Sequence, residues 1–305
     1  MSEHALPTRK DFLVAMAGGA LMAQTAAAQP VRGKLLIVAA HPDDEYAFAA
    51  ATYRLVREAG WIADQVVITN GEAGYRYSAL AEAFYGVALT PTAEGRARLA
   101  EIRKKETANA GKILGIRSHY FLDQKDLGFA TDASTADSRN WDRPYLRTFL
   151  SDLLKREQYD AVFTLLPTAG THGHHRAATL LALEAVDHLS GARPIVFGVD
   201  AGEKGEPPLT FTGLSSEPLT RTVSAEPALV IDRDVCFGYR DALSYRIVVD
   251  WLIAEHKSQG LFQSDYNKHR FERFWLFAAS GGDALQRLAG FEAQFQTSSR
   301  KGTSK

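Results

Sequence analysis

Four ionisable side chains fall within five consecutive positions early in the chain. The segment His41-Pro-Asp-Asp-Glu45 follows an apolar run directly and precedes a pattern with helical spacing. Asp43 or Asp44 could cap that helix, but a cap does not explain a histidine beside three acids. Because neighbouring carboxylates repel one another, either solvent or a cation must offset their charge. The segment therefore predicts a metal site.

A second cluster holds three of the nine histidines in the chain. His172, His174 and His175 lie within four positions, after another short apolar run. One isolated histidine is more often structural or simply exposed, whereas three together at the end of a predicted strand favour metal binding. We expect both clusters to contribute to one site.

The residue types in the two clusters indicate which metal and which chemistry to expect. Two histidines and one carboxylate, with one position open to water, form the usual mononuclear catalytic zinc site. A second carboxylate nearby can act as general base. Adjacent side chains project in different directions, so Asp43 and Asp44 cannot easily bind one metal together. The pair supplies one residue for each role.

The scaffold that must join these clusters can be read from the periodicity of the chain. Short apolar runs typical of buried strands alternate with amphipathic helical patterns, which indicates βαβ units and a parallel sheet covered on both faces. Ligands bind at the carboxyl ends of the strands in such sheets, where both clusters fall. The expected strands are 34–40, 65–69, 119–122, 161–166 and 194–198, and the expected helices are 47–58, 93–114, 143–157 and 176–189.

Other segments extend this α/β core. Residues 73–93 are predicted to form a long loop, and residues 200–235 an added β-segment or cap. Helices are expected at 239–257 and 283–295. The fold class is thus a mostly parallel α/β sheet with helices on both faces and a C-terminal β and helical elaboration.

The first residues differ from the rest. A basic stretch, an apolar run too short to span a bilayer and the small residues Ala26-Ala-Ala28 follow in the order of a signal peptide. We expect residues 1–28 to be a leader resembling a twin-arginine signal, 29–299 a single domain and 300–305 a disordered tail. The mature protein would then be exported to a bacterial periplasm or secreted.

Composition excludes some partners. The chain has 35 basic and 36 acidic residues, a net charge of −1, and so no electrostatic footprint for nucleic acid. One cysteine, Cys236, allows no internal disulfide. No later apolar run is long enough to be an integral membrane segment. A small molecule or glycoconjugate is the expected partner, and the chain could form a homo-oligomer.

The sequence resembles the PIG-L/LmbE-like deacetylases. The similarity rests on Ala40-His-Pro-Asp-Asp-Glu45 after the first strand and on His172-Gly-His-His175, and it covers roughly residues 34–260. Further matches are Thr69-Asn-Gly-Glu-Ala-Gly74, Arg103-Lys-Lys-Glu106, Leu114-Gly-Ile116 and Glu255-His-Lys-Ser-Gln259.

The resemblance implies a Rossmann-like fold and zinc-dependent hydrolysis of an N-acetyl group, usually on a glucosamine-type sugar. It implies one zinc ion per chain, held by His41, Asp44 and His175, with Asp43 as general base. It places a histidine that helps to stabilise the oxyanion at His172. Residues expected at the substrate are Arg103, Asp126, His174 and Glu72, of which Glu72 could instead cap a turn.

One departure from the family pattern and two other functions remain open. The family usually has His-Pro-Asp-His or His-Pro-Asn-His where this chain has Gly173 and His174 in the middle, so His174 could support a ligand from behind or be an extra ligand. The altered segment would also suit a non-catalytic, metal-dependent sugar-binding protein. His41-x-Asp43 with a distant histidine would suit a non-haem iron oxygenase, although Asp44 would then be unexplained.

Overall fold

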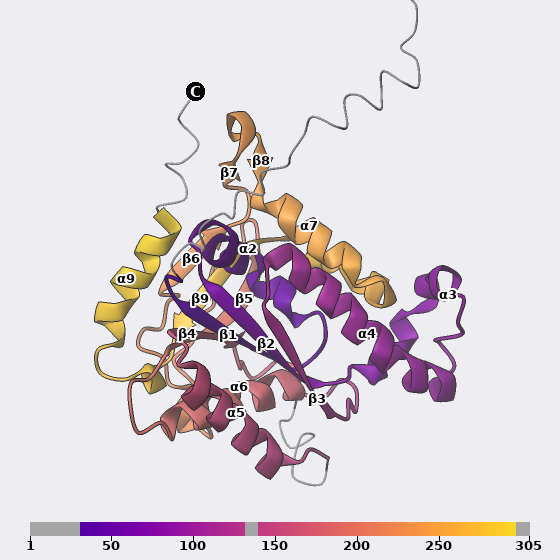
Figure 1. Ribbon diagram of the computed structural model, residues 1–305, viewed down its shortest axis with the longest axis horizontal. Coiled ribbons are helices and arrows are strands. Elements are labelled where there is room, and N and C mark those ends of the chain that lie inside the picture. The colour runs from indigo at the N-terminus through magenta and orange to yellow at the C-terminus, as the bar shows by residue number, and fades with distance from the viewer. Residues whose placement is uncertain (1–30, 132–139, 297–305) are drawn as a thin grey trace, which may run out of the picture. The chain divides into compact units, whose positions relative to one another are not determined.

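A seven-stranded sheet forms the centre of the protein (Figure 1). The computed structural model describes residues 31–131 and 140–296, so the predicted leader and tail lie outside the described residues. The strands lie in the order β3-β2-β1-β4-β5-β9-β6. The first five are parallel, and β9 pairs antiparallel with both β5 and β6. Their bounds are β1 Lys34–Ala39, β2 Ile62–Thr69, β3 Ser118–Gln124, β4 Ala161–Leu165, β5 Ile195–Glu203, β6 Leu229–Asp232 and β9 His269–Leu276.

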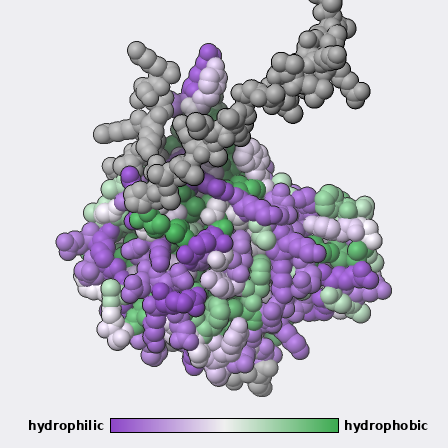
Figure 2. All heavy atoms as spheres, viewed as in Figure 1, coloured by the Kyte–Doolittle hydropathy of each residue, from purple (hydrophilic) through white to green (hydrophobic). Residues whose placement is uncertain are grey.

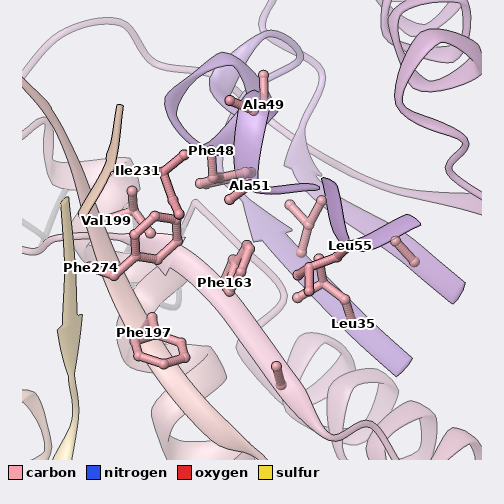
Figure 3. Close-up of a cluster of buried hydrophobic side chains, with 14 of the residues drawn as sticks. Leu35, Phe48, Ala49, Ala51, Leu55, Phe163, Phe197, Val199, Ile231 and Phe274 are labelled. Carbon is pink, nitrogen blue, oxygen red and sulfur yellow. The ribbon is translucent and has the colours of Figure 1, made fainter. Parts of the chain in front are cut away.

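Helices cover both faces of this sheet. Within β1, Leu35 and Ile37 pack on one face while Leu36 and Val38 pack on the other, as the twofold alternation of a strand requires. The first face is covered by α2 Ala49–Tyr53, α4 Thr92–Leu114, α7 Tyr245–Glu255 and α9 Ala284–Gln296, and the second by α5 Arg143–Glu157 and α6 Gly173–Asp187. Figure 3 shows how side chains of β1, β4, β5 and β9 meet those near α2 on the first face.

The α/β prediction is confirmed, and all five predicted parallel strands are present. Local sequence explains where several helices begin and end. Asp142 accepts a hydrogen bond from the Tyr145 amide and so caps α5, with Pro144 in its first turn. Gly115 ends α4 with a φ of 85°, a left-handed conformation that glycine adopts without steric cost.

Two predictions about the added segments were wrong. Residues 73–93 are not an irregular loop, because they contain a 3-10 turn at Glu72–Tyr77 and the short helix α3 Ala79–Tyr85. The helix expected from residue 239 begins only at Tyr245, because a small hairpin, β7 Cys236–Phe237 and β8 Leu243–Ser244, precedes it. Gly238, with a φ of 72°, follows β7 at the turn of that hairpin.

The strand β9 escaped prediction because charged residues interrupt its apolar pattern. Glu272 and Arg233 are both fully buried and form an ion pair at 3.0 Å. The Glu272 carboxylate also accepts hydrogen bonds from the amides of Ala50 and Ala51, each at 2.8 Å, at the start of α2. A buried charge is tolerated when it is paired and hydrogen-bonded, so the polar residue is compatible with a central strand.

Removing one partner of this buried pair should destabilise the protein strongly. Arg233→Met leaves the Glu272 carboxylate buried without its counter-charge, and we expect a loss of about 3–5 kcal/mol in the free energy of unfolding. Urea unfolding measures the loss. Arg147→Met is the matched control, because the Arg147 side chain is 53% exposed and pairs with Glu184 on the surface, where a change below about 1 kcal/mol is expected. Equal losses in the two variants would contradict the prediction.

None of the helices within residues 31–131 and 140–296 combines the length and the hydropathy needed to cross a membrane.

Candidate functional site

The two ionisable clusters meet where β1 and β4 end. His41 and Asp44 follow β1, and His175 lies in the first turn of α6, which follows β4. The His175 Nε2 atom lies 3.0 Å from His41 Nδ1 and 3.0 Å from Asp44 Oδ1. The third side of the triangle, His41 Nδ1 to Asp44 Oδ1, is 3.7 Å. Three potential ligand atoms therefore face one common point.

The spacing of these atoms fits a zinc ion. Ligands held about 2.0 to 2.1 Å from a tetrahedral zinc ion are separated from one another by about 3.3 to 3.4 Å, close to the observed 3.0, 3.0 and 3.7 Å. Two imidazoles and one carboxylate leave a fourth position for water. His41, His172 and His174 also form a compact group, but this group lacks a carboxylate and shares His41 with the first.

Asp44 is held as a carboxylate with one oxygen free for this site. Its Oδ2 atom accepts hydrogen bonds from the amides of Ala40 and His41, each at 2.8 Å, which leaves Oδ1 toward the two histidines. Burial by itself would raise the pKa of Asp44, but His175 and His41 outweigh it and hold that pKa well below its usual range.

Asp43 lies beside the triangle of His41, Asp44 and His175 but is not part of it. Its backbone has a φ of 125°, a strained conformation for a residue other than glycine, and such strain is concentrated at functional sites. Burial raises the pKa of Asp43 to about 6, although Arg103 opposes the shift. The pKa values of the two adjacent aspartates are therefore shifted in opposite directions, that of Asp43 upward and that of Asp44 downward.

Arg103 contacts Asp43 from the α4 helix. Its Nη2 atom lies 3.0 Å from Asp43 Oδ1 and also donates to the Pro42 carbonyl, while Nη1 donates to the Gly71 carbonyl at 2.7 Å. A side chain at Gly71 would collide with this guanidinium. Arg103 is 3% exposed but still lines the cavity described below. Its main contacts are therefore with the loops that carry Asp43 and Gly71.

The Arg103–Asp43 contact should be visible in the pH dependence of activity. Asp43 must be deprotonated to act as a base, so activity should fall as the pH drops through the pKa of this carboxyl. Arg103 lowers that pKa, so Arg103→Met should move the acidic limb of kcat/KM upward by about one pH unit. Arg98→Met, at an exposed position of the same helix, should leave the limb in place. Superimposable profiles for Arg103→Met and the wild type would contradict the prediction.

The other two histidines of the second cluster lie next to this triangle. His172 precedes α6, and its Nδ1 atom accepts a hydrogen bond from the His174 amide at 3.0 Å. His174 is completely buried, with its Nδ1 atom 3.1 Å from His41 Nε2 and 3.5 Å from Asp126 Oδ1. His41 thus faces Asp44 and His175 with one ring nitrogen and His174 with the other.

A cavity of about 340 Å³ opens onto this group. The predicted site residues that line it are Asp43, His41, Asp44, His175, His172, Arg103 and Asp126. Glu72 and His174 are not among its lining residues. Asp126 is buried and accepts hydrogen bonds from the amides of Gly128 and Ala73. The structure thus brings together most of the predicted site residues and places His174 behind the wall.

Several wall residues were not singled out from the sequence. Phe262 and Tyr266, which lie one helical turn apart in α8 Gly260–Tyr266, line the cavity together with Phe129 and Thr171. The only sequence signal was the spacing of Phe262 and Tyr266, four positions apart after the Ser258-Gln259 segment. This spacing predicts a shared helix face but not a cavity wall. Their position depends on packing between segments far apart in sequence.

A buried ion pair ties the first cluster to the C-terminal part of the domain. Glu45 is fully buried, and its Oε1 atom lies 2.6 Å from His256 Nε2. The two partners come from the loop after β1 and from the end of α7. Glu45 therefore supports the loop and is not part of the triangle of His41, Asp44 and His175.

Sequence comparison places both clusters in a known family. The model of the PIG-L family, described as GlcNAc-PI de-N-acetylase, matches residues 36–186. A curated relative from Catenulispora acidiphila, named 1D-myo-inositol 2-acetamido-2-deoxy-alpha-D-glucopyranoside deacetylase 3, is 32% identical over 162 residues, covering 50% of this chain and 44% of the relative. The match thus spans less than half of that relative's length.

Structural comparison shows the same fold in solved proteins. N,N'-diacetylchitobiose deacetylase from Pyrococcus horikoshii superimposes with a TM-score of 0.51 and 17% identity, covering 91% of this chain and 96% of that one. GalB from Pseudomonas putida, a 4-carboxy-2-hydroxymuconate hydratase, gives a TM-score of 0.51 and 19% identity over 80% and 95%. At such identities the likeness concerns the fold alone. By the segment 36–186, which contains both clusters, the chain belongs to the PIG-L family.

Proposed function

We propose that the protein is a zinc-dependent hydrolase that removes the acetyl group from an N-acetylated amino sugar or sugar conjugate. The observation that carries this proposal is the triangle of His41, Asp44 and His175 with Asp43 beside it and outside it. Metal ligands and a separate base are the minimum set for metal-assisted amide hydrolysis. The family and the curated relative's name support the choice of an N-acetyl sugar.

The chain's own residues would divide the work of hydrolysis. When bound, the zinc ion would supply a Lewis acid and lower the pKa of water. Asp43 would take the proton from the attacking water and deliver it to the leaving amine, which suits a carboxyl whose pKa is raised toward neutrality. Arg103 would keep Asp43 oriented and largely ionised at neutral pH.

His172 would stabilise the charge that develops on the amide oxygen. Because its Nδ1 atom accepts the His174 amide, the neutral ring carries its proton on Nε2 and can donate from there. Burial lowers the pKa of His172 to about 4, which favours this neutral donor over a protonated histidine.

His174 would act through His41 and not on the substrate. If His41 Nδ1 binds the metal, its Nε2 atom carries the proton and donates to His174 Nδ1. Among the described residues the other His174 nitrogen has no hydrogen-bond partner. The histidine would thereby take over the supporting role suggested for the family's acidic or amide residue.

His174→Ala should therefore weaken zinc binding without removing a ligand. The expected loss of affinity is about 10- to 100-fold, the usual effect of deleting a partner of a metal-bound imidazole. Competition with a chromogenic chelator measures it without any turnover. Affinity equal to the wild type would show that His174 only fills space.

Contacts to the sugar are proposed for the residues that line the cavity. Asp126 offers a buried carboxylate there, and Arg103 reaches the same space from α4. Glu72, which is partly buried at the start of a 3-10 turn, would support the turn that carries the lining residues Ala73 and Gly74.

The other two functions fit the geometry less well. An iron site built on His41 and Asp43 would need Asp43 among the ligands, but neither compact group found in the described part of the chain contains Asp43. A pure sugar-binding protein would not need the strained, buried Asp43.

A deacetylation screen tests the proposed function. N-acetylated sugars and their conjugates are incubated with the protein as purified, after removal of metal by a chelator, and after restoration with zinc, and acetate release is measured. We expect acetate only in the first and third conditions. Binding of these sugars without acetate release would favour the non-catalytic sugar-binding protein. Turnover that iron restores and that consumes oxygen would favour the oxygenase.

A further inference from the structure

An apolar surface continues from the cavity wall onto the outside of the protein. Tyr77 and Phe262 line the cavity, and their rings contact each other edge to face with centroids 4.6 Å apart. From Tyr77 the chain enters α3, and from Phe262 it runs through α8. These two short helices therefore form the rim at this end of the cavity.

Both helices carry large apolar side chains that are exposed. Leu80 is 80% exposed, Phe84 is 65% exposed and Leu261 is 59% exposed. Leu80 and Phe84 lie four positions apart and so share one face of α3. A methyl group added at Gly260 would lie 3.7 Å from Leu80, which places α3 directly against the start of α8. Figure 2 shows hydrophobic residues at the surface on the side where Figure 1 places α3.

Together these residues form what we call the α3–α8 strip. It consists of Tyr77, Leu80, Phe84, Leu261 and Phe262. An exposed apolar patch of this kind marks a binding surface more often than scattered apolar residues do. Its inner end is part of the cavity wall, so a molecule bound in the cavity can extend onto it.

We propose that the α3–α8 strip is a subsite for an apolar group attached to the sugar of the substrate. This inference rests on the proposed function and narrows its substrate class to N-acetylated amino sugars with an apolar substituent. The acetamide would enter toward His41, Asp44 and His175, while the substituent would leave the cavity past Tyr77 and Phe262. The aromatic rings would contact the first part of the substituent, and Leu80 and Phe84 the rest.

Two substrates that differ only in such a group test the proposal. N-acetylglucosamine is compared with its octyl glycoside, kept below the concentration at which it forms micelles, and kcat/KM is measured for each in the presence of zinc. We expect the wild type to prefer the octyl glycoside by about tenfold or more, because part of the alkyl chain leaves water. A ratio near one would overturn the proposal.

Substitutions on the strip locate the preference. The double variant Leu80→Ser/Phe84→Ser should lose most of the octyl preference. Tyr239→Ser/Leu285→Ser is the matched control, because these side chains are 71% and 61% exposed on the β7–β8 hairpin and α9; its ratio should equal that of the wild type. An unchanged ratio in the strip variant would overturn the proposal.

Binding measurements separate this inference from the proposed function. Calorimetric titration of the Asp43→Asn protein with the two sugars compares affinities without turnover, so a protein that deacetylates neither sugar still reports on the strip. If the octyl glycoside binds no more tightly than N-acetylglucosamine, the proposed subsite is disproved. A different result would show that the strip contacts a membrane instead. In that case both sugars bind with equal affinity, and the protein co-sediments with phosphatidylcholine vesicles unless the strip is substituted.

Discussion

Asp43→Asn is expected to lower kcat/KM by about 10³-fold while zinc stays bound. The amide keeps the shape of the carboxyl but cannot take a proton from water. Asparagine tolerates a positive φ better than most residues, so the strained backbone at residue 43 should persist. Kinetic assays give the loss, and metal analysis of the same sample gives the zinc content.

The neighbouring aspartate provides the control for this experiment. Asp44→Asn alters an oxygen that faces the metal position, and it should lose zinc together with activity. Asp43→Asn should thus lose activity alone, whereas Asp44→Asn should lose both zinc and activity. Normal turnover by Asp43→Asn would disprove the assignment of the base, and loss of zinc from it would place Asp43 among the ligands.

His175→Ala is expected to have the other large effect. It removes a side chain that lies 3.0 Å from both remaining ligand atoms, so the site would retain only His41 and Asp44. We expect the zinc content to fall from about one ion per chain to nearly none, and kcat/KM to fall by about 10³-fold or more. Metal analysis after dialysis and an acetate-release assay measure the two effects.

His188→Ala is the matched control for the ligand substitution. His188 lies at the end of the same helix, α6, and is exposed to solvent. Its removal should change neither zinc content nor turnover. Zinc retained by His175→Ala at the wild-type level would mean that the metal uses a different set of groups, such as His41, His172 and His174.

The pattern of strands and helices could be predicted because it depends on local spacing. The apolar run 34–40 and the helical spacing of 93–114 lie close to the observed β1 and α4. Parallel strands joined by helices bring their carboxyl ends to one edge of the sheet. His41 and His175 follow β1 and β4, which are neighbours in that sheet, so two distant clusters could be expected to meet.

The missed elements depend on interactions that local spacing does not contain. The strand β9 carries Glu272, which is acceptable in the sheet only because Arg233 pairs with it. Likewise, the short helix α3 packs against the segment that begins α8, more than a hundred residues later. A pattern-based prediction has no access to either partner.

By itself, the sequence determined the fold class and the kinds of groups at the site, because periodicity and strand ends are properties of the continuous chain. Only the tertiary structure decided how those groups face one another. It turned His41 Nδ1 toward Asp44 and His175 and His41 Nε2 toward His174, and it directed Arg103 at Asp43. These orientations arise from packing between elements far apart in sequence, since each side chain takes the direction that its distant neighbours leave open.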